Sequence, residues 1–282
     1  MTTLDGRVAV VCGASRGIGK GIAVELAAAG ARVVAVGRTE RSGTATITGS
    51  LEETVAEITA AGGSATAVGC DATDEKSVAS LFDKIAGSHG HVDVLVNSVF
   101  NSHQFVATIG VPFWELPMAA WHEVVEVGTK SAYLASVAAA PLMLRTANAS
   151  GHGAGTGGLI VNISGRGAER YRYNVVYGVG KAALDRLTRD MADELRPHGV
   201  SVVSLWPNVT RTENLDRDPE RSRASFGDLE QLETPRYSGR AVVALASDPA
   251  VTERSGKRYW VAELGAQYGF TDENGRQHEL PE

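Results

Sequence analysis

The stretch VAVVCGASRGIGKGIAVELAAAG, residues 8–30, decides the fold of this chain. It joins a short apolar run to a helical pattern through a turn that contains Gly13, Gly17 and Gly19. Glycine lets the backbone approach an anion without a Cβ in the way, and the first turn of a helix supplies free N–H groups and a positive dipole end. A glycine triplet alone is a weak signal, with a plain tight turn as the alternative. The strand before it and the helix after it favour a site for the phosphates of a nucleotide.

Short apolar runs alternate with helical patterns along the rest of the chain. Their β-branched, nearly continuous hydrophobic character suits strands buried on both faces. The seven predicted strands are 8–12, 32–36, 65–70, 92–97, 159–164, 200–206 and 257–262, and the main predicted helices are 18–29, 51–61, 75–86, 119–147, 177–195 and 238–247. The alternation predicts an α/β fold: a doubly wound, seven-stranded parallel sheet with helices on both faces.

No linker, internal repeat or long polar tract divides the 282 residues. We therefore expect a single domain over 1–282 that carries both nucleotide binding and catalysis. Irregular stretches at 38–50, about 98–117 and 208–235 follow predicted strands two, four and six. In a doubly wound sheet the ligand crevice lies beyond the carboxyl ends of the strands, so the last two stretches are expected to form variable substrate loops.

Composition excludes several classes of protein. Hydrophobic residues make up 43% of the chain and no apolar run approaches the ~20 residues that span a bilayer, which predicts a soluble protein. The first residues show no export signal, so we expect a cytoplasmic location with Cys12 and Cys70 as buried, reduced thiols. A net charge of −6 without a basic block argues against nucleic acid or membrane as partners. His89 and His91 lack a second ligand pair, so no metal site is expected.

The second strand ends with Gly37 and Arg38, where a site specific for NAD(H) would present a carboxylate to the ribose 2′-hydroxyl. A guanidinium at this position can instead pair with a 2′-phosphate, and Arg16 in the glycine turn is a second cation. The two arginines favour NADP(H) over NAD(H). The alternative is that each only lines the rim of a loop, and Glu40 nearby is an acid in the same stretch.

The segment YGVGK places Tyr177 and Lys181 four residues apart, so both lie on one face if this segment is helical. A phenol with a pKa of about 10 is a poor proton carrier near neutrality, and a fixed ammonium lowers that value. The pair could then transfer a proton to or from a carbonyl oxygen. By spacing alone it could equally be a packed tyrosine beside a long lysine. Ser164, at the end of the fifth predicted strand, adds a third polar group.

These features together resemble the short-chain dehydrogenase/reductases. The turn matches the TGxxxGIG motif of that family except that Cys12 replaces the threonine, and Ser164 followed by Y-x-x-x-K matches its catalytic pattern. The resemblance extends from residue 5 to about 262 and implies a Rossmann fold. It also implies that Ser164 binds the substrate oxygen, that Tyr177 is the acid and base, and that Lys181 holds the nicotinamide ribose and tunes the tyrosine.

The resemblance also assigns cofactor contacts. In the family the GCDAT segment contacts adenine, the asparagine that ends strand four begins an NNAG motif, and a PGxxxT segment after strand six covers the nicotinamide. The implied cofactor residues are Gly13, Ser15, Arg16, Gly17, Ile18, Gly19, Arg38, Asp71, Ala72, Asn97, Tyr177, Lys181, Pro207 and Thr212.

The chain departs from the family pattern at three places. NSVF keeps only the first residue of NNAG, Asn208 replaces the glycine of PG, and Gly128 stands where the family has the asparagine of its proton relay. The last departure puts the relay in doubt, but a glycine there is normal in one branch of the family that this chain resembles. We expect an NADP(H)-dependent carbonyl reductase, reversible toward the alcohol. The alternatives are a non-catalytic NADP(H) sensor and an NAD(H)-preferring alcohol dehydrogenase.

Aromatic residues in the variable loops favour an apolar ketone or aldehyde as substrate. They are Phe100, Phe105, Phe113, Trp114, Tyr171, Tyr173 and Phe226. Trp114 and Trp121, about two helical turns apart, could instead be packing residues. By analogy with the family, two helices rich in small residues, SAYLASVAAAPLML and YGVGKAALDRL, predict a homo-oligomer, either a dimer or a tetramer.

Overall fold

The computed structural model describes residues 4–100, 106–149 and 157–281. Seven strands form one sheet in the order β3-β2-β1-β4-β5-β6-β7. The strands are β1 (Val8–Cys12), β2 (Arg32–Gly37), β3 (Ser64–Gly69), β4 (Val94–Asn97), β5 (Leu159–Ile163), β6 (Ser201–Trp206) and β7 (Arg258–Trp260). The expected seven-stranded α/β sheet is confirmed.

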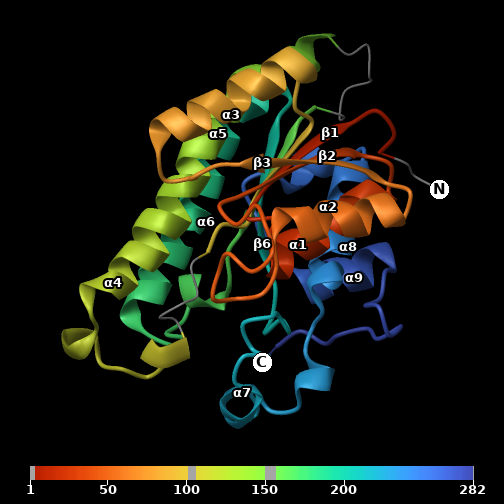
Figure 1. Cartoon of the computed structure of the whole chain (residues 1–282). Helices are drawn as coiled ribbons and strands as arrows, with labels where there is room; N and C mark the ends of the chain where they lie inside the picture. Colours follow the sequence, from red (N-terminus) through yellow and green to blue (C-terminus); the bar gives the residue numbers. More distant parts are fainter. Residues whose placement is uncertain (1–3, 101–105, 150–156, 282) are drawn as a thin grey trace. The chain divides into compact units, whose positions relative to one another are not determined.

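The α-helices are α1 (Gly17–Ala28), α2 (Leu51–Ala60), α3 (Glu75–Ser88), α4 (Met118–Trp121), α5 (Ser131–Ala149), α6 (Val175–Leu195), α7 (Pro219–Phe226), α8 (Pro235–Ser247) and α9 (Val261–Tyr268). The chain forms two compact units, which are described separately below (Figure 1). The nucleotide-loop unit comprises Met1–Cys70, Pro207–Pro249 and Tyr259–Glu282, and the tyrosine unit comprises Asp71–Trp206 and Ala250–Arg258.

In the nucleotide-loop unit β1, β2 and β3 pair in parallel, with Val8 opposite Arg32 and Arg32 opposite Ser64. Every residue of β1 is buried, as the apolar sequence predicts. β3 differs, because most of its residues are exposed. It is the end strand of the sheet and its sequence SATAVG has small side chains, so the prediction of a strand buried on both faces is wrong for β3.

Two glycines bring α1 and α8 of this unit into close contact, which Figure 1 shows. A Cβ on Gly21 would lie 2.3 Å from the carbonyl carbon of Pro235, and a Cβ on Gly239 would lie 2.7 Å from the carbonyl oxygen of Gly21. No side chain fits at either position without a shift of the backbone. The small residues of α1 therefore fix its distance from α8.

In the tyrosine unit β4, β5 and β6 pair in parallel, and β4 and β5 are fully buried. Helix α6 packs on β5 and β6, and α3 packs on α5. Helix α3 begins at an aspartate cap, since Asp74 accepts hydrogen bonds from the N–H groups of Lys76 and Ser77. Its buried face consists of Val78, Leu81, Phe82 and Ile85, which have the spacing of an amphipathic helix.

Three segments depart from the predicted elements. The helix expected over 119–147 is divided, because η3 (His122–Lys130) is a π-helix between α4 and α5. The loop expected over 208–235 contains α7. The strand expected over 257–262 ends at Trp260, because Glu263 accepts a hydrogen bond from the Trp260 N–H at 3.4 Å and α9 begins at Val261.

Both cysteines are buried and form no disulfide, as expected. Burial raises the pKa of Cys12 to about 12, so this thiol stays protonated. No helix of the described ranges has the length and the apolar character needed to cross a membrane. The cytoplasmic location stays a prediction.

A buried carboxyl group holds the segment that follows β6. Glu233 is 2% exposed, and its Oε2 accepts a hydrogen bond from the Asn208 N–H at 3.0 Å. Burial, together with the charge of Asp272, raises the pKa of Glu233 to about 8, although the hydrogen bond from Asn208 lowers it. Asp272 itself pairs with His278 at 2.8 Å. The start of the 208–235 segment is therefore fixed by an acid that favours its neutral form.

The raised pKa of Glu233 predicts a pH dependence of stability. Between the ordinary value of 4.5 and about 8 the folded state binds the proton more tightly than the unfolded state, so this group lowers stability as pH rises. Glu233→Gln removes the effect and keeps an acceptor for Asn208. Urea unfolding at pH 5 and pH 8.5 measures the free energy of unfolding of both proteins. Relative to the wild type, that of the variant should rise by about 1.4 kcal/mol for each pH unit between the two pKa values. The exposed Glu220→Gln is the control, and a gap that does not change with pH would contradict the assignment.

Candidate active site

In the nucleotide-loop unit the glycine turn closes tightly over the start of α1. Gly13 and Gly17 have φ values of 90° and 56°, in the left-handed region that favours glycine. A Cβ on Gly19 would lie 2.2 Å from the carbonyl oxygen of Gly13. Ser15 is buried between these glycines, and Ile18 lies in the first turn of α1. The turn therefore packs closely against the start of α1, and its use as a phosphate cradle stays a prediction.

An acidic side chain lies at the start of this helix. The Gly17 N–H donates a hydrogen bond to Oε2 of Glu213 at 2.8 Å. Thr212 is beside it, since a Cβ on Gly17 would lie 3.3 Å from its Cγ2. The carboxylate shows that this helix N-terminus accepts an anion. The resemblance implied Thr212 only as part of a segment that covers the nicotinamide, so its place beside the glycine turn was not predicted, and no sequence signal indicated Glu213.

The two predicted cations have different surroundings. Arg16 donates hydrogen bonds to the carbonyl oxygens of Thr48 at 2.9 Å and Gly49 at 2.7 Å, and to Oγ1 of Thr39 at 3.1 Å. Arg38 is exposed and has no hydrogen bond or ion pair in the described part of the chain. Arg16 therefore holds the loop after β2, and Arg38 is the cation available to a phosphate.

Burial lowers the pKa of Arg16, Glu213 opposes that effect, and Arg38 adds to it. The positive charge of Arg38 is therefore close enough to repel the guanidinium group of Arg16. A dianionic phosphate near both would relieve the repulsion between them. The turn, the helix start and Arg38 are therefore the groups of this unit that can contact an anion.

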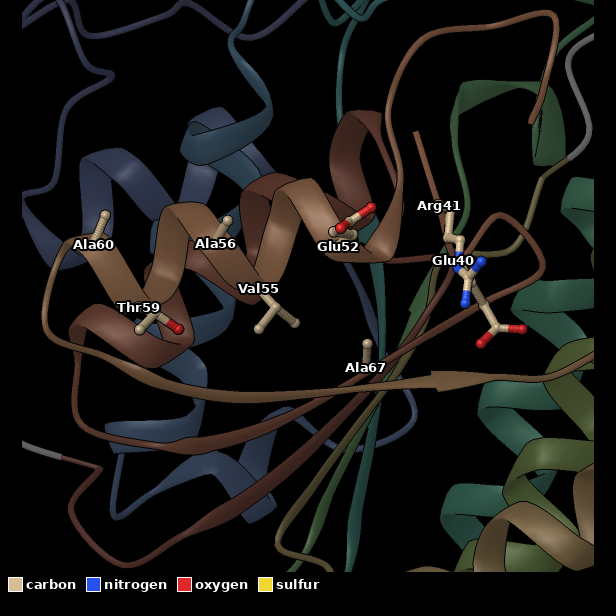
Figure 2. A pocket seen from close by; sticks show the side chains of 8 residues that line it. All are labelled: Glu40, Arg41, Glu52, Val55, Ala56, Thr59, Ala60 and Ala67. Carbon is tan, nitrogen blue, oxygen red and sulfur yellow. The ribbon is translucent and has the colours of Figure 1, made fainter. Parts of the chain in front are cut away.

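A groove of about 710 Å³ lies between α2, β3 and the loop after β2, and Figure 2 shows the side chains that line it. Its walls come from Val55, Ala56, Thr59 and Ala60 of α2 and from Ala67 of β3, together with Glu40, Arg41 and Glu52. None of the predicted site residues lines this groove, and two carboxylates face it. It therefore does not carry the predicted chemistry.

In the tyrosine unit the segment YGVGK lies in the first turns of α6. Asn174 caps the helix, because its Oδ1 accepts a hydrogen bond from the Tyr177 N–H at 2.9 Å. The two glycines permit close contacts: a Cβ on Gly178 would lie 3.3 Å from the carbonyl oxygen of Gly167, and one on Gly180 would lie 2.5 Å from Cγ1 of Val124. The neighbouring segments can therefore pack directly against the helix that carries the tyrosine.

Lys181 is a buried ammonium group. Its Nζ donates a hydrogen bond to the carbonyl oxygen of Ile163 at 3.1 Å and lies 5.1 Å from the ring centroid of Phe100. Burial lowers the pKa of Lys181 to about 8, with the charge of Asp185 partly opposing the shift. Asp185, one turn further along α6, accepts hydrogen bonds from Ser204 and from Trp206. Sequence spacing could have indicated Asp185, which lies four residues after the lysine.

Ser164 follows β5 directly and is 5% exposed. Its Oγ donates a hydrogen bond to the carbonyl oxygen of Lys181 at 3.0 Å. The hydroxyl of Tyr177 lies close to the next residue, because a Cβ on Gly165 would lie 2.9 Å from it. The three predicted catalytic residues are therefore brought together at the end of β5.

The phenol of Tyr177 is enclosed by aromatic rings. The ring centroid of Tyr173 is 5.1 Å away and that of Phe100 is 6.4 Å away, both edge to face. Burial raises the pKa of Tyr177, Tyr173 raises it further, and Arg172 opposes the shift. This direction is opposite to the one expected from an adjacent ammonium. The reason is that burial in a mainly apolar site is the largest influence on the pKa of Tyr177. Lys181 Nζ lies over the ring of Tyr177, 5.7 Å from its centroid.

The other predicted positions of this unit have structural partners. Asn97 donates hydrogen bonds to Ser136 at 3.1 Å and Asn162 at 2.8 Å, while its buried carbonyl oxygen has no partner in the described ranges. Such an oxygen can accept from a bound ligand or water. Asp71 accepts hydrogen bonds from Thr73 at the turn before α3, and Ala72 beside it is buried.

Gly128 lies in the π-helix η3. A Cβ there would meet only two carbonyl oxygens, each at 3.9 Å, so the position has room for a side chain. Pro207 is the first residue after β6 and belongs to the nucleotide-loop unit. It directly precedes Asn208, whose N–H donates a hydrogen bond to Glu233. Residues 4–100, 106–149 and 157–281 contain no group of three or more possible metal ligands.

The aromatic residues divide into two groups. Phe100 and Tyr173 contact Tyr177, whereas Phe113, Trp114 and Tyr171 are 63%, 72% and 72% exposed. Trp121, at the end of α4, is 38% exposed. Neither Trp114 nor Trp121 is therefore a core packing residue. Phe226 ends α7 in the nucleotide-loop unit, and Phe105 lies outside the described residues.

Comparisons with known proteins agree with this geometry. The family model for short chain dehydrogenase matches residues 7–222. Dehydrogenase/reductase SDR family member 1 from Mus musculus is 40% identical over 97% of this chain and 85% of its own length.

Two solved structures are similar as well. A 7α-hydroxysteroid dehydrogenase complexed with NADH and 7-oxo glycochenodeoxycholic acid is 28% identical, with a TM-score of 0.74 over 98% of this chain and 97% of that one. A metagenomic short-chain oxidoreductase in complex with NADP is 29% identical, with a TM-score of 0.67 over 88% of this chain and 93% of that one. The expected resemblance is confirmed: the chain belongs to the short-chain dehydrogenase/reductases, in the branch of dehydrogenase/reductase SDR family member 1, and is an oxidoreductase that acts on CH–OH groups.

Proposed function

We propose that this oxidoreductase uses NADP(H) to reduce an apolar ketone or aldehyde to the alcohol, reversibly, through Ser164, Tyr177 and Lys181. The observation that carries the proposal is the cluster at the end of β5, where the serine hydroxyl, the phenol and the buried ammonium lie together. One domain with both functions is part of the proposal. Each compact unit is assembled from separated stretches of the chain, as expected when neither is an independent insertion.

The bound cofactor supplies the hydride, and the chain supplies binding and proton transfer. The backbone N–H groups at the start of α1 hold the pyrophosphate and Arg38 pairs with the 2′-phosphate. The NADP-bound neighbour supports NADP(H), and the NADH-bound neighbour represents the alternative.

At the carbonyl, Ser164 Oγ turns from the Lys181 carbonyl to bind the substrate oxygen, and the hydroxyl of Tyr177 donates its proton to that oxygen. Burial keeps the phenol protonated, so the proton needed for reduction is present, although the raised pKa makes its transfer harder until a cation comes near the hydroxyl. Phe100 and Tyr173 provide an apolar wall beside the phenol. The ketone in the steroid dehydrogenase complex belongs to the same substrate class.

We also propose a homo-oligomer, as the family resemblance suggests. Apolar side chains are exposed on α5 at Tyr133 and Val137 and on α6 at Val175 and Val179. Exposed apolar residues on the two helices that carry the predicted contacts support assembly of identical subunits.

Tyr177→Phe should lower kcat for NADPH-dependent reduction of cyclohexanone-type ketones by about 10²- to 10⁴-fold, because the proton donor is lost. NADPH binding, measured by fluorescence titration, should stay within about twofold of the wild type, since the change removes only one hydroxyl group. If the wild type binds NADPH but turns over no ketone or aldehyde in a broad panel, the non-catalytic sensor is the correct function.

Arg38→Ala should weaken NADPH binding by about 10- to 100-fold, because a charge-assisted hydrogen bond to phosphate is lost. NADH binding should hardly change, since NADH has no 2′-phosphate. The matched control is Arg32→Ala, an exposed arginine at the opposite end of β2. An unchanged preference for NADPH over NADH in Arg38→Ala would refute the assignment of NADP(H) specificity to this residue.

Glu213→Gln should tighten binding of NADPH and NADH alike by about two- to fivefold, because the negative charge at the start of α1 competes with the pyrophosphate. The amide oxygen of glutamine can still accept from the Gly17 N–H, so the segment keeps its position. Calorimetric titration measures the effect, with Glu220→Gln as control. Weaker binding in Glu213→Gln would show that the carboxylate supports the cofactor site instead of competing for it.

A further inference from the structure

The loop between β5 and α6 encloses Tyr177 and is basic. Gly165 and Gly167 lie against the tyrosine. A Cβ on Gly165 would lie 2.9 Å from the Tyr177 hydroxyl, and a Cβ on Gly167 would lie 2.4 Å from Cε1 of Tyr177. The same loop carries Arg166, Arg170 and Arg172, whose side chains have no hydrogen bond or ion pair in the described part of the chain. Its one acid, Glu169, is neutralised by Arg258 at 3.1 Å. These cations stand out in a chain of net charge −6.

The backbone of this loop is strained at Tyr173. Its φ of 66° makes it the one non-glycine residue of the described ranges in the left-handed region, where a bulky side chain is unfavourable. Two contacts with a distant segment hold it there. The Gly110 N–H donates to the Tyr173 carbonyl at 2.8 Å, and the Asn174 side chain donates to Thr108. Strain that neighbouring contacts maintain is common at ligand sites.

The strained residue carries a stack that ends at the proposed acid. The guanidinium carbon of Arg172 lies 5.0 Å from the ring centroid of Tyr173, and the ring of Tyr173 lies 5.1 Å from that of Tyr177. The guanidinium group of Arg172 makes a cation–π contact with the ring of Tyr173. The N–H groups of Arg172 have no acceptor among the described residues. An exposed guanidinium that rests on an aromatic ring and has no described hydrogen-bond acceptor suits a ligand with an anionic group.

We propose that Arg172 binds an anionic group of the substrate, so that the carbonyl compound selected by this site is an apolar oxo acid. The inference rests on the proposed function and narrows it from apolar ketones to ketones that carry a carboxylate. The apolar part lies against Tyr173 and Phe100, and the carboxylate pairs with the fork of N–H donors on Arg172. The effect of Arg172 on the pKa of Tyr177 supports an electrostatic path between the anion site and the phenol.

The test compares 4-oxocyclohexanecarboxylate with its methyl ester, which has the same ring and carbonyl but no charge. With NADPH and the full chain, the acid should have a lower KM than the ester by about 10-fold or more, with similar kcat. Arg172→Gln should raise the KM of the acid by about 10- to 100-fold and change the ester by less than about twofold. Arg172→Lys should restore part of the effect, because it keeps the charge and loses the fork. Raising the ionic strength should raise the KM of the acid in the wild type only.

The matched control is Arg189→Gln, an exposed arginine on α6 without a described ion pair. Equal treatment of acid and ester by the wild type, or an equal loss for both in Arg172→Gln, would overturn the proposal. Calorimetric binding of the two compounds to the protein with NADP⁺ gives the same comparison without turnover. If neither compound is reduced but the acid alone binds in an Arg172-dependent manner, the anion site stands and the proposed reaction fails.

Discussion

The tyrosine unit depends on the burial of one charge, the ammonium of Lys181. A buried ammonium is costly unless it is hydrogen-bonded, and here the carbonyl of Ile163 and the ring of Phe100 provide the contacts. The backbone carbonyl of Lys181 in turn accepts a hydrogen bond from the hydroxyl of Ser164. Helix α6 and the end of β5 are thus joined at two points, and these points also orient the serine and the lysine. Stability and the placement of the proposed catalytic groups therefore rest on the same contacts.

Much of this arrangement could be predicted from local sequence. A helix brings Tyr177 and Lys181 onto one face whatever surrounds it, and a glycine turn between strand and helix can be recognised from its neighbours alone. The left-handed Tyr173 could not be predicted, because its conformation depends on Gly110 and Thr108, far away in the chain. The π-helix at Gly128 and the early end of β7 also depend on packing and capping that no periodic pattern encodes.

Sequence alone also could not separate the roles of the two arginines in the nucleotide-loop unit. Both are cations near the glycine turn, but three hydrogen bonds occupy Arg16 within the loop after β2, while Arg38 keeps its donors. The start of α1 likewise attracts any anion, and Glu213 from a distant segment occupies it. If the proposed cofactor phosphate binds here, it has to displace a carboxylate. The affinity of the proposed site would then reflect the difference between two anions at one helix end.

The protonation state of Tyr177 links these features to the direction of the reaction. Burial and the charge of Tyr173 both raise its pKa, so the phenol holds its proton, and in the proposed reaction that proton is the one donated to the carbonyl oxygen. Oxidation of an alcohol would need the phenolate, which only the nearby cations can stabilise. A carboxylate bound at Arg172 would cancel one of them and favour the neutral phenol further. The substrate that the loop is proposed to select would therefore also strengthen the acid form that its own reduction requires.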